Sequence, residues 1–231
     1  MKIGIIGAGQ IGGTLTRRLR ALGHDVAVAN ARGPETLADL AAETGARAVT
    51  PREAVRGVDL VVVTIQQPRV RELPADLFAD VPDDVVVVDT GNYYPRHRDG
   101  RIDEIEDGLL ESQWVEQVLG RPVVKAFNNI GAQSLMEKGR PAGDPDRVAL
   151  PVAGDRERDK ATVLALVEEL GFDAIDAGTL ADSWRQQPGT PVYVADLDAD
   201  GVRKALAEAS HERPAEFRAT EKSPGTFMEP A

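Results

Sequence analysis

The sequence predicts an α/β fold built on a doubly wound, mostly parallel sheet of about eight strands. Three observations carry this prediction. Short runs rich in Val and Ile alternate with helical patterns along most of the 231 residues. Several runs are apolar throughout, which is typical of strands in a parallel sheet covered by helices on both faces. A glycine-rich turn also joins the first run to an uninterrupted helical pattern.

The expected strands share a short length and a high content of β-branched residues. They are residues 2–6, 25–29, 46–50, 59–65, 84–90, 122–127, 147–153 and 172–176. Between them, Leu and Ala recur at helical spacing, and several of these segments end in Gly, a common helix stop. After about residue 177 the pattern loosens into turn-forming residues and one more short helix.

The composition excludes several classes of protein. The net charge is −11, which argues against partners such as nucleic acid or an anionic membrane surface. The chain has no Cys, so disulfides, thiolate metal sites and cysteine nucleophiles are excluded. We expect no metal site. The longest apolar runs are far shorter than the ~20 residues that span a bilayer, and no signal-peptide pattern is present. We therefore expect a cytoplasmic protein.

The stretch "GAGQIGG", residues 7–13, has the spacing G-x-G-x-x-G between the first strand and helix. Gly7 permits a tight turn, Gly9 lets the backbone approach a pyrophosphate, and Gly12 lets the helix pack against the strand. The alternative is a purely structural turn, but the strand–turn–helix context favours a dinucleotide on a Rossmann-like fold. The pyrophosphate is expected at the helix N-terminus. The residues expected to hold it are Gly7, Ala8, Gly9, Gln10, Ile11 and Gly12.

The end of the second strand favours NADP(H) over NAD(H). NAD sites usually have Asp or Glu there to bind the ribose 2′-hydroxyl, whereas this strand ends in Asn30. Arg32 follows and can pair with a 2′-phosphate through charge-assisted hydrogen bonds. The alternative for Arg32 is a solvated loop arginine.

Polar and aromatic residues follow the fourth, fifth and sixth expected strands, at the sheet edge where ligands of open α/β sheets bind. Amides and hydroxyls can bind a carboxamide or the edge of a heterocycle, and aromatic rings can pack on it. The alternative is that the Asn and Gly residues only form turns. Expected cofactor contacts here are Thr64, Ile65, Gln66 and Asn128. Candidates for positioning a reacting ring are Asn92, Tyr93 and Asn128.

The sequence shows no convincing set of acid–base residues for an alcohol dehydrogenase. Hydride transfer to a conjugated ring needs mainly proximity and orientation, so a flavin or deazaflavin acceptor fits this absence. Reduction of a small carbonyl or imine is an alternative, and it would need Tyr93, Tyr94 or His97 as proton donor. A non-catalytic NADP-sensing protein is a third hypothesis.

Four stretches resemble the F420-dependent NADP oxidoreductase family and are also similar to the cytoplasmic reductase domain of the STEAP metalloreductases. They are "IGIIGAGQIGGTLTRRLRALGHDVAVANARGPE", "VVVTI", "VVKAFN" and "PVAGDRERDKATVLALVEELGFDAIDAGTLADS", within residues 1–185. The glycine loop is generic, whereas "VVKAFN" and the segment from Gly154 to Gly178 are much more specific to this group. Two stretches, "TGNYYPRHRDGR" and "WRQQPGTPVY", do not match the archaeal-type F420 enzymes.

The resemblance implies an NADPH-dependent oxidoreductase that transfers hydride between NADP(H) and a flavin-like acceptor, coenzyme F420 or FMN/FAD. It implies pyrophosphate at residues 7–12, and the 2′-phosphate at Asn30 and Arg32, although Ala31 replaces a commonly seen Ser. It also implies that Thr64 and Ile65 line the cofactor path and that Asn128 lies near the nicotinamide. Haem-linked iron reduction is not implied.

We expect one domain over residues 1–231. Its parts are an NADP-binding core at 1–130, a sheet extension at 131–185 and a C-terminal wrap or tail at 186–231. The expected partner is a small-molecule hydride acceptor, and the expected assembly is a homodimer.

Overall fold

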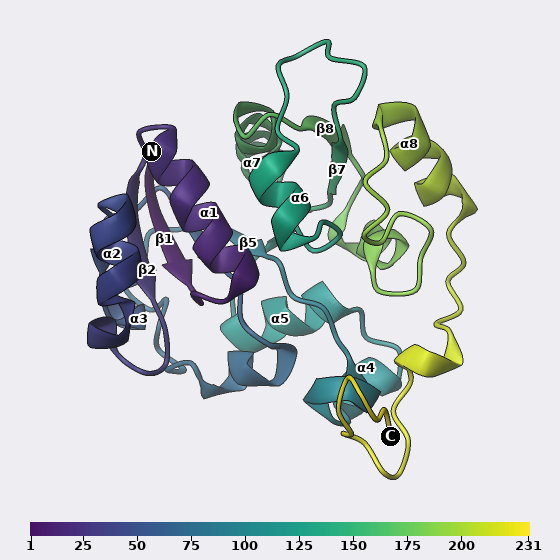
Figure 1. Ribbon diagram of the computed structural model, residues 1–231. Coiled ribbons are helices and arrows are strands. Elements are labelled where there is room, and N and C mark those ends of the chain that lie inside the picture. Colours follow the sequence, from purple (N-terminus) through teal and green to yellow (C-terminus); the bar gives the residue numbers. More distant parts are fainter.

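A six-stranded parallel sheet forms the centre of the N-terminal half of the chain (Figure 1). The computed structural model describes residues 1–231. The sheet order is β3-β2-β1-β4-β5-β6, and the chain therefore reverses its direction of winding between β1 and β4. The strands are β1 (Lys2–Ile6), β2 (Asp25–Ala29), β3 (Arg47–Ala48), β4 (Leu60–Val63), β5 (Val86–Asp89) and β6 (Val124–Lys125). The predicted fold class is confirmed.

The last two predicted strands form a separate sheet, which corrects the expectation of one continuous sheet. β7 (Ala149–Val152) and β8 (Asp173–Asp176) pair in parallel with each other. They meet the large sheet only through an antiparallel bridge between Lys125 and Ala153. Because β7 runs against β6, the bridge cannot continue the parallel ladder, and it ends after one residue pair.

Helices cover both faces of the large sheet. The α-helices are α1 (Gln10–Ala21), α2 (Ala38–Thr44), α3 (Pro51–Ala54), α4 (Asp103–Glu106), α5 (Glu111–Leu119), α6 (Ala132–Glu137), α7 (Glu157–Glu169) and α8 (Ala199–Glu208). Short helical turns are η1 (Pro34–Leu37), η2 (Gln67–Glu72), η3 (Pro95–Asp99), η4 (Leu180–Gln186) and η5 (Ala215–Phe217). None of the helices has the length and apolar character needed to cross a membrane.

The two faces of the sheet carry two separate apolar cores. Along β1, Ile5 faces the cluster that contains α1 and α7, whereas Ile6 faces the cluster that contains α3 and α5. Val62 and Val63 of β4 divide in the same way. Strand residues are therefore buried whichever way they point, which explains why the strands are apolar throughout.

The C-terminal part of the chain runs across the molecule after β8. α8 packs against β7 and β8 through Val202, Ala205 and Leu206. The following segment passes η5 and ends beside α4, far from α8 (Figure 1). The backbone N–H groups of Gly225 and Ala231 both donate to the carbonyl oxygen of Arg96, at 2.8 and 3.0 Å. These bonds fix the last residues against η3, although their sequence shows no periodicity.

Candidate functional site

A cavity of about 550 Å³ opens at the carboxyl ends of β1, β4, β5 and β6. Its walls come from the glycine loop, from the loops after these strands, and from two segments near the C-terminus. Its volume lies within the range of roughly 300–1,000 Å³ that is usual for small-molecule sites. It lies where the direction of winding changes, the usual ligand position in an open α/β sheet.

The three motif glycines differ in what surrounds them. A Cβ atom on Gly7, which has φ +114°, would lie 2.2 Å from the carbonyl oxygen of Thr64. A Cβ on Gly12 would lie 1.9 Å from the carbonyl oxygen of Gly7. A Cβ on Gly9 would meet nothing within 4 Å, and the backbone there has φ −74°. The fold itself therefore requires Gly7 and Gly12, whereas the space at Gly9 is open to a ligand.

The N-terminus of α1 is suited to an anion. Its N-cap residue is Gly9, which supplies no side-chain cap, and no acidic side chain lies in the first turn. Gln10 and Ile11 of this turn line the cavity. The first N–H groups of a helix lack partners within it, and the helix dipole adds a partial positive charge. This end of the cavity fits a pyrophosphate.

Asn30 and Arg32 lie outside the cavity, in the loop that follows β2. The Oδ1 atom of Asn30 accepts a hydrogen bond from the Arg32 backbone N–H at 2.9 Å, and its Nδ2 donates to Thr36 Oγ1 at 2.9 Å. Asn30 thus shapes the loop. The exposed Arg32 side chain forms no ion pair. Its guanidinium remains available to a phosphate on a dinucleotide that crosses from α1 past β2.

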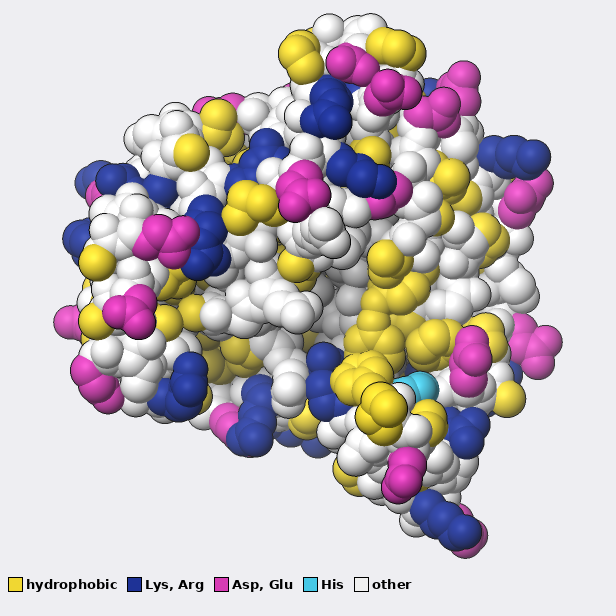
Figure 2. Space-filling model, in the orientation of Figure 1, with side chains coloured by type: hydrophobic (Ala, Val, Ile, Leu, Met, Phe, Trp, Pro, Cys, Tyr) yellow, Lys and Arg dark blue, Asp and Glu magenta, His cyan; other side chains and the backbone are white.

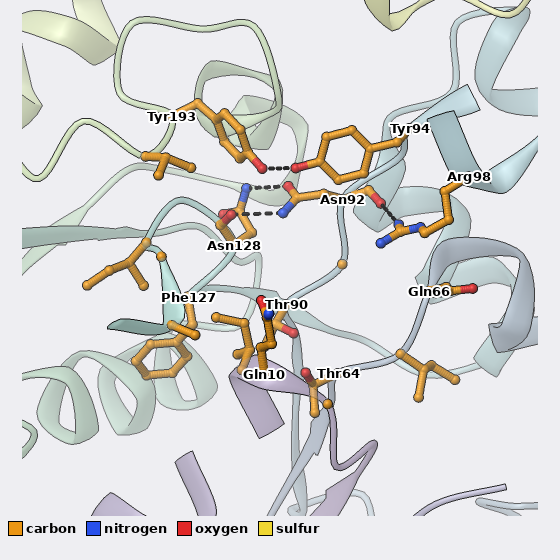
Figure 3. A pocket seen from close by; sticks show the side chains of 18 of the residues that line it. Gln10, Thr64, Gln66, Thr90, Asn92, Tyr94, Arg98, Phe127, Asn128 and Tyr193 are labelled. Carbon is orange, nitrogen blue, oxygen red and sulfur yellow. Dashed lines mark hydrogen bonds between the residues drawn. The ribbon is translucent and has the colours of Figure 1, made fainter. Parts of the chain in front are cut away.

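Asn92 and Asn128 lie side by side at the cavity wall, but they bind each other (Figure 3). Asn92 Nδ2 donates to the Asn128 carbonyl oxygen at 2.8 Å, and Asn128 Nδ2 donates to Asn92 Oδ1 at 3.1 Å. Asn128 Nδ2 also donates to the carbonyl oxygen of Gln186 at 2.6 Å. Both amide protons of Asn128 are thereby used within the protein, whereas Asn92 retains one.

Tyr93 does not line the cavity, which makes its assignment as a ring-positioning residue wrong. Its side chain is fully buried in the core that contains α5, and its hydroxyl accepts from the Ile102 N–H at 2.8 Å. The next residue, Tyr94, lines the cavity and hydrogen-bonds through its hydroxyl to Tyr193. Successive side chains in this extended loop point in opposite directions, so one tyrosine enters the core and the other the cavity.

A buried charge cluster that the sequence analysis missed supports the loop after β5. The fully buried Lys125 Nζ donates to the Gly91 carbonyl oxygen at 2.8 Å. It lies 3.7 Å from Asp89 Oδ2 and 3.7 Å from Glu111 Oε2. Asp89 also accepts from Ser112 Oγ at 2.6 Å. A lysine within the apolar run "PVVKAF" was the available signal, because an unpaired charge is rarely buried.

Burial raises the pKa of Glu111 to about 7, and the positive charge of Lys125 opposes this shift. Glu111 accepts from the backbone N–H of Tyr93 at 3.2 Å, and its own carbonyl oxygen accepts from Gln67 Nε2 at 2.8 Å. The cluster thus fixes residues 91–93 from below. It does not line the cavity.

The remaining predicted residues divide between the cavity and its support. Ala8 is half-buried against the core on the α1 side of the sheet. His97 stands behind the wall, with its ring 5.4 Å from that of Phe227. No group of His, Asp and Glu side chains could hold a metal ion.

Predicted residues that line the cavity are Gly9, Gln10, Ile11, Thr64, Ile65, Gln66, Asn92 and Asn128. Lining residues that were not predicted include Thr90, Arg98, Phe127, Tyr193, Val194 and Phe227.

Residues 2–93 match the family model described as NADP oxidoreductase, coenzyme F420-dependent. This part of the chain belongs to that family. The matched region contains the glycine loop, the loop after β2, and the strand ends from β4 to Tyr93. The family resemblance predicted from the sequence is confirmed, and these residues match an NADP-dependent oxidoreductase family.

Curated relatives match parts of the chain at the sequence level. Protein YjhV of Escherichia coli K12 is 42% identical over 66 residues, which is 29% of this chain and 48% of that protein. Metalloreductase STEAP3 of Rattus norvegicus is 28% identical over 183 residues, which is 79% of this chain and 35% of that protein. The chain therefore spans less than half the length of each.

Several solved structures match over most of the chain. The hypothetical protein SMa0349 from Sinorhizobium meliloti is 30% identical, with a TM-score of 0.73, over 87% of this chain and 96% of that one. A protein from Arthrobacter sp. FB24, assigned provisionally as an F420-dependent NADP reductase, is 23% identical with a TM-score of 0.63. That alignment covers 79% of this chain and 87% of the other, and it shows a shared fold.

Proposed function

We propose that this protein transfers hydride between NADP(H) and a flavin-like acceptor, coenzyme F420 or FMN/FAD, in the cavity at the strand ends. One observation carries the proposal: the cavity joins two chemically different halves. One half holds the open backbone at Gly9 and the uncapped N-terminus of α1. The other half is aromatic, with Tyr94, Tyr193 and Phe227 in its wall. A dinucleotide suits the first half, and a planar ring suits the second.

The loop after β2 supports NADP(H) as the dinucleotide. Arg32 presents an unpaired cation there, and the residue at the strand end is the neutral Asn30. The carboxylate of this loop is Glu35. Its side chain lies beside Gly33, with Oε1 2.4 Å from where a Cβ on Gly33 would stand. Glu35 is five residues beyond the position at which an NAD enzyme holds the ribose 2′-hydroxyl. The loop can therefore accept a 2′-phosphate on Arg32.

The cavity lining suits orientation better than proton transfer. Bound NADPH would supply a hydride to the acceptor ring, leaving NADP⁺, and water would supply the proton that completes the two-electron reduction. Thr64 and Thr90 are the threonines of the lining, and no pair of carboxylate and histidine side chains lines the cavity. Arg98 lines it too, but its guanidinium is bound by the buried Asp99 carboxylate at 2.6 and 2.8 Å.

The test is an acceptor screen with the purified protein. We expect NADPH to be oxidised in the presence of F420, FMN or FAD, with NADH a much poorer donor. The control for background oxidation of NADPH is the Gly9→Val variant, which leaves the remaining surface unchanged. Tight NADPH binding without oxidation by any acceptor would overturn the proposal and favour a sensor of the NADP(H) redox state.

A specific observation favours reduction of a carbonyl or imine as the second candidate. The paired hydroxyls of Tyr94 and Tyr193 lie in the cavity and could deliver a proton. Burial raises the pKa of Tyr94 to about 12, so this hydroxyl is protonated at neutral pH. If small carbonyls or imines are reduced while flavins are not, and Tyr94→Phe abolishes that activity, this candidate replaces the first.

A further inference from the structure

The aromatic half of the cavity is built largely by residues distant from the nucleotide-binding motifs. Tyr193 and Val194 come from the loop between η4 and α8, and Phe227 comes from the final turn of the chain. Figure 3 shows the Tyr94 and Tyr193 hydroxyls facing each other on the side of the cavity opposite Gln10 and Thr64. Tyr94, Tyr193, Val194 and Phe227 lie outside the region, residues 2–93, that matches the NADP oxidoreductase family.

The turn that carries Phe227 is held in place by the body of the protein. Gly225 and Ala231 bond to the Arg96 carbonyl oxygen, and Arg96 Nε donates to the carbonyl oxygen of Ala231. Within the turn, the Thr226 N–H donates to the Glu229 carbonyl oxygen at 2.9 Å. The Phe227 ring then stands 5.7 Å from the ring of Tyr94, at 67° to it.

Large apolar side chains are exposed at this end of the cavity. Phe227 is 61% exposed and Val194 is 49% exposed, although both line the cavity. Figure 2 shows hydrophobic side chains running as a strip from the hollow in this face towards a surface histidine. Val194 also has φ +54°, a conformation that β-branched residues rarely adopt, and its N–H donates to the Asn129 carbonyl oxygen at 2.9 Å. Exposed apolar surface in a concave site marks a place for an apolar ligand.

The tyrosine pair adds one polar requirement to this apolar surface. Two hydroxyls that bond to each other use one proton between them and leave the second free to donate. The Tyr94 hydroxyl is protonated at neutral pH, since the ordinary pKa of tyrosine is about 10 and burial raises it to about 12 here. The pair can therefore bind one hydrogen-bond acceptor, such as a carbonyl oxygen at the edge of a planar ring.

We propose that Tyr193, Val194 and Phe227, together with Tyr94, form the binding subsite for the hydride acceptor, and that this acceptor is a planar aromatic ring with a carbonyl oxygen at its edge. The ring packs against Phe227 and Val194, and its carbonyl oxygen accepts from the tyrosine pair. This inference rests on the proposed function, because it assigns the second substrate of the same cavity. It also assigns Phe227, in the final turn of the chain, to substrate binding.

Phe227→Ala is the first test, and Met228→Ala is its matched control. Met228 occupies the same turn and is 90% exposed, but it does not line the cavity. FMN and F420 serve as probes, titrated by fluorescence into protein saturated with NADP⁺, and the NADPH affinity is measured separately. We expect Phe227→Ala to weaken the binding of FMN or F420 about tenfold and to leave the affinity for NADPH within about twofold of the wild-type value. Met228→Ala should change neither.

The double variant Tyr94→Phe/Tyr193→Phe separates hydrogen bonding from packing in the same subsite, because it removes both hydroxyls and keeps both rings. We expect it to weaken the binding of FMN or F420 about five- to tenfold. The binding of an aliphatic probe without a ring carbonyl should not change, because such a probe accepts no hydrogen bond from the hydroxyls. Phe227→Tyr should restore most of the binding lost in Phe227→Ala, because the ring is retained.

The outcomes distinguish this inference from the proposed function. If the wild type binds FMN or F420 but never transfers hydride to it, the proposed function fails and the subsite stands. If hydride transfer occurs and Phe227→Ala changes neither the Kd nor the KM of the ring, the subsite assignment is wrong. An equal loss of NADPH affinity would assign Phe227 to the cofactor instead, and failure of the wild type to bind either ring probe would overturn both.

Discussion

At the glycine loop, residues of one type serve two different purposes. Gly7 and Gly12 have no room for a side chain because backbone atoms of the protein occupy that space. Gly9 has room, and only a ligand would need it. The sequence motif treats all three alike. The structure separates the two that the fold requires from Gly9, which only the proposed dinucleotide binding would require.

Gly9→Val should abolish dinucleotide binding without unfolding the protein. The added side chain enters open space next to the first turn of α1, where the pyrophosphate is expected. We expect NADPH affinity to fall by about a hundredfold or more, as measured by calorimetry, with an unchanged melting temperature. Gly12→Ala is the contrasting variant. Its Cβ would collide with the Gly7 carbonyl oxygen, so it should lose about 1–3 kcal/mol of stability. Unchanged NADPH affinity in folded Gly9→Val would show that the loop is only structural.

Arg32→Ala should weaken the binding of NADPH much more than the binding of NADH. Loss of one charge-assisted hydrogen bond costs roughly 1.5–3 kcal/mol, which corresponds to about ten- to a hundredfold in affinity. The two Kd values should be measured in parallel at low and high salt, because an exposed ion contact weakens with ionic strength. Arg203→Ala, an exposed arginine of α8, is the control and should affect neither cofactor. An equal loss for NADPH and NADH would exclude the 2′-phosphate assignment.

At the scale of the elements, the loops after β5 and β6 behave as one unit. Asn92 and Asn128 join them on the cavity side, and Lys125 joins β6 to the Gly91 carbonyl oxygen from below. The Asp89 and Glu111 carboxylates surround that lysine, each 3.7 Å from its Nζ. Removing the lysine alone would leave two buried carboxylates without their cation, a change that typically costs 3–5 kcal/mol. The cavity floor is therefore rigid, which suits a reaction that depends on orientation.

Glu111 should make stability depend on pH in a way that Glu111→Gln removes. Its pKa in the folded protein is about 7, above that of an unfolded-chain glutamate, so the native state binds more protons between those values. This contribution is fully present below the unfolded pKa and is lost as pH rises through about 7. We expect the free energy of unfolding of the wild type to fall relative to Glu111→Gln between about pH 5 and pH 8.

Urea denaturation of both proteins across that range is the measurement. Glu208→Gln, a substitution on the exposed end of α8, serves as the control for general electrostatic changes. A difference between wild type and Glu111→Gln that stays constant with pH would show that Glu111 titrates alike in the folded and unfolded chains.

At the scale of the whole molecule, local patterns predicted the elements but not all of their partners. All eight strands occur where β-branched runs predicted them, because short apolar runs and the glycines that end helices are local signals. The edge strands β3 and β6 are shorter than predicted, with two residues each, since they have a parallel neighbour on one side only. The apolar pattern does not show in which direction a strand runs. It therefore did not predict that β7 runs against β6 and forms a separate sheet with β8.

The cavity was predictable in its nucleotide half and not in its other half. Gly9, Thr64 and Gln66 follow strands at one sheet edge, so topology alone brings them together. Tyr193 meets Tyr94 across 99 residues of sequence, from a turn-rich segment without periodicity. The ring-positioning role predicted for Tyr93 is wrong because sequence does not reveal which of two adjacent loop residues faces the core.

The division of the cavity between two parts of the chain leads to a direct test of the chemistry. In the proposed complex, the glycine loop and the residues after β4 would hold the dinucleotide on one side, and the aromatic wall would limit where an acceptor ring can lie. Only one face of the nicotinamide can then meet the acceptor. With NADPH deuterated stereospecifically at C4, we expect one of the two epimers to deliver deuterium to C5 of reduced deazaflavin. With FMN, the same epimer should show a primary isotope effect.

Asn92→Ala should lower the rate of that transfer without changing its stereochemistry, because the amide holds the loop and exchanges no proton. A displacement near 1 Å can cost about a hundredfold in rate, which single-turnover kinetics would detect. His97→Ala should have a small effect, since its ring lies behind Phe227, outside the cavity lining. Deuterium that appears in a carbonyl or imine product and never on a ring, with Tyr94→Phe inactive, would establish acid–base chemistry in this cavity instead.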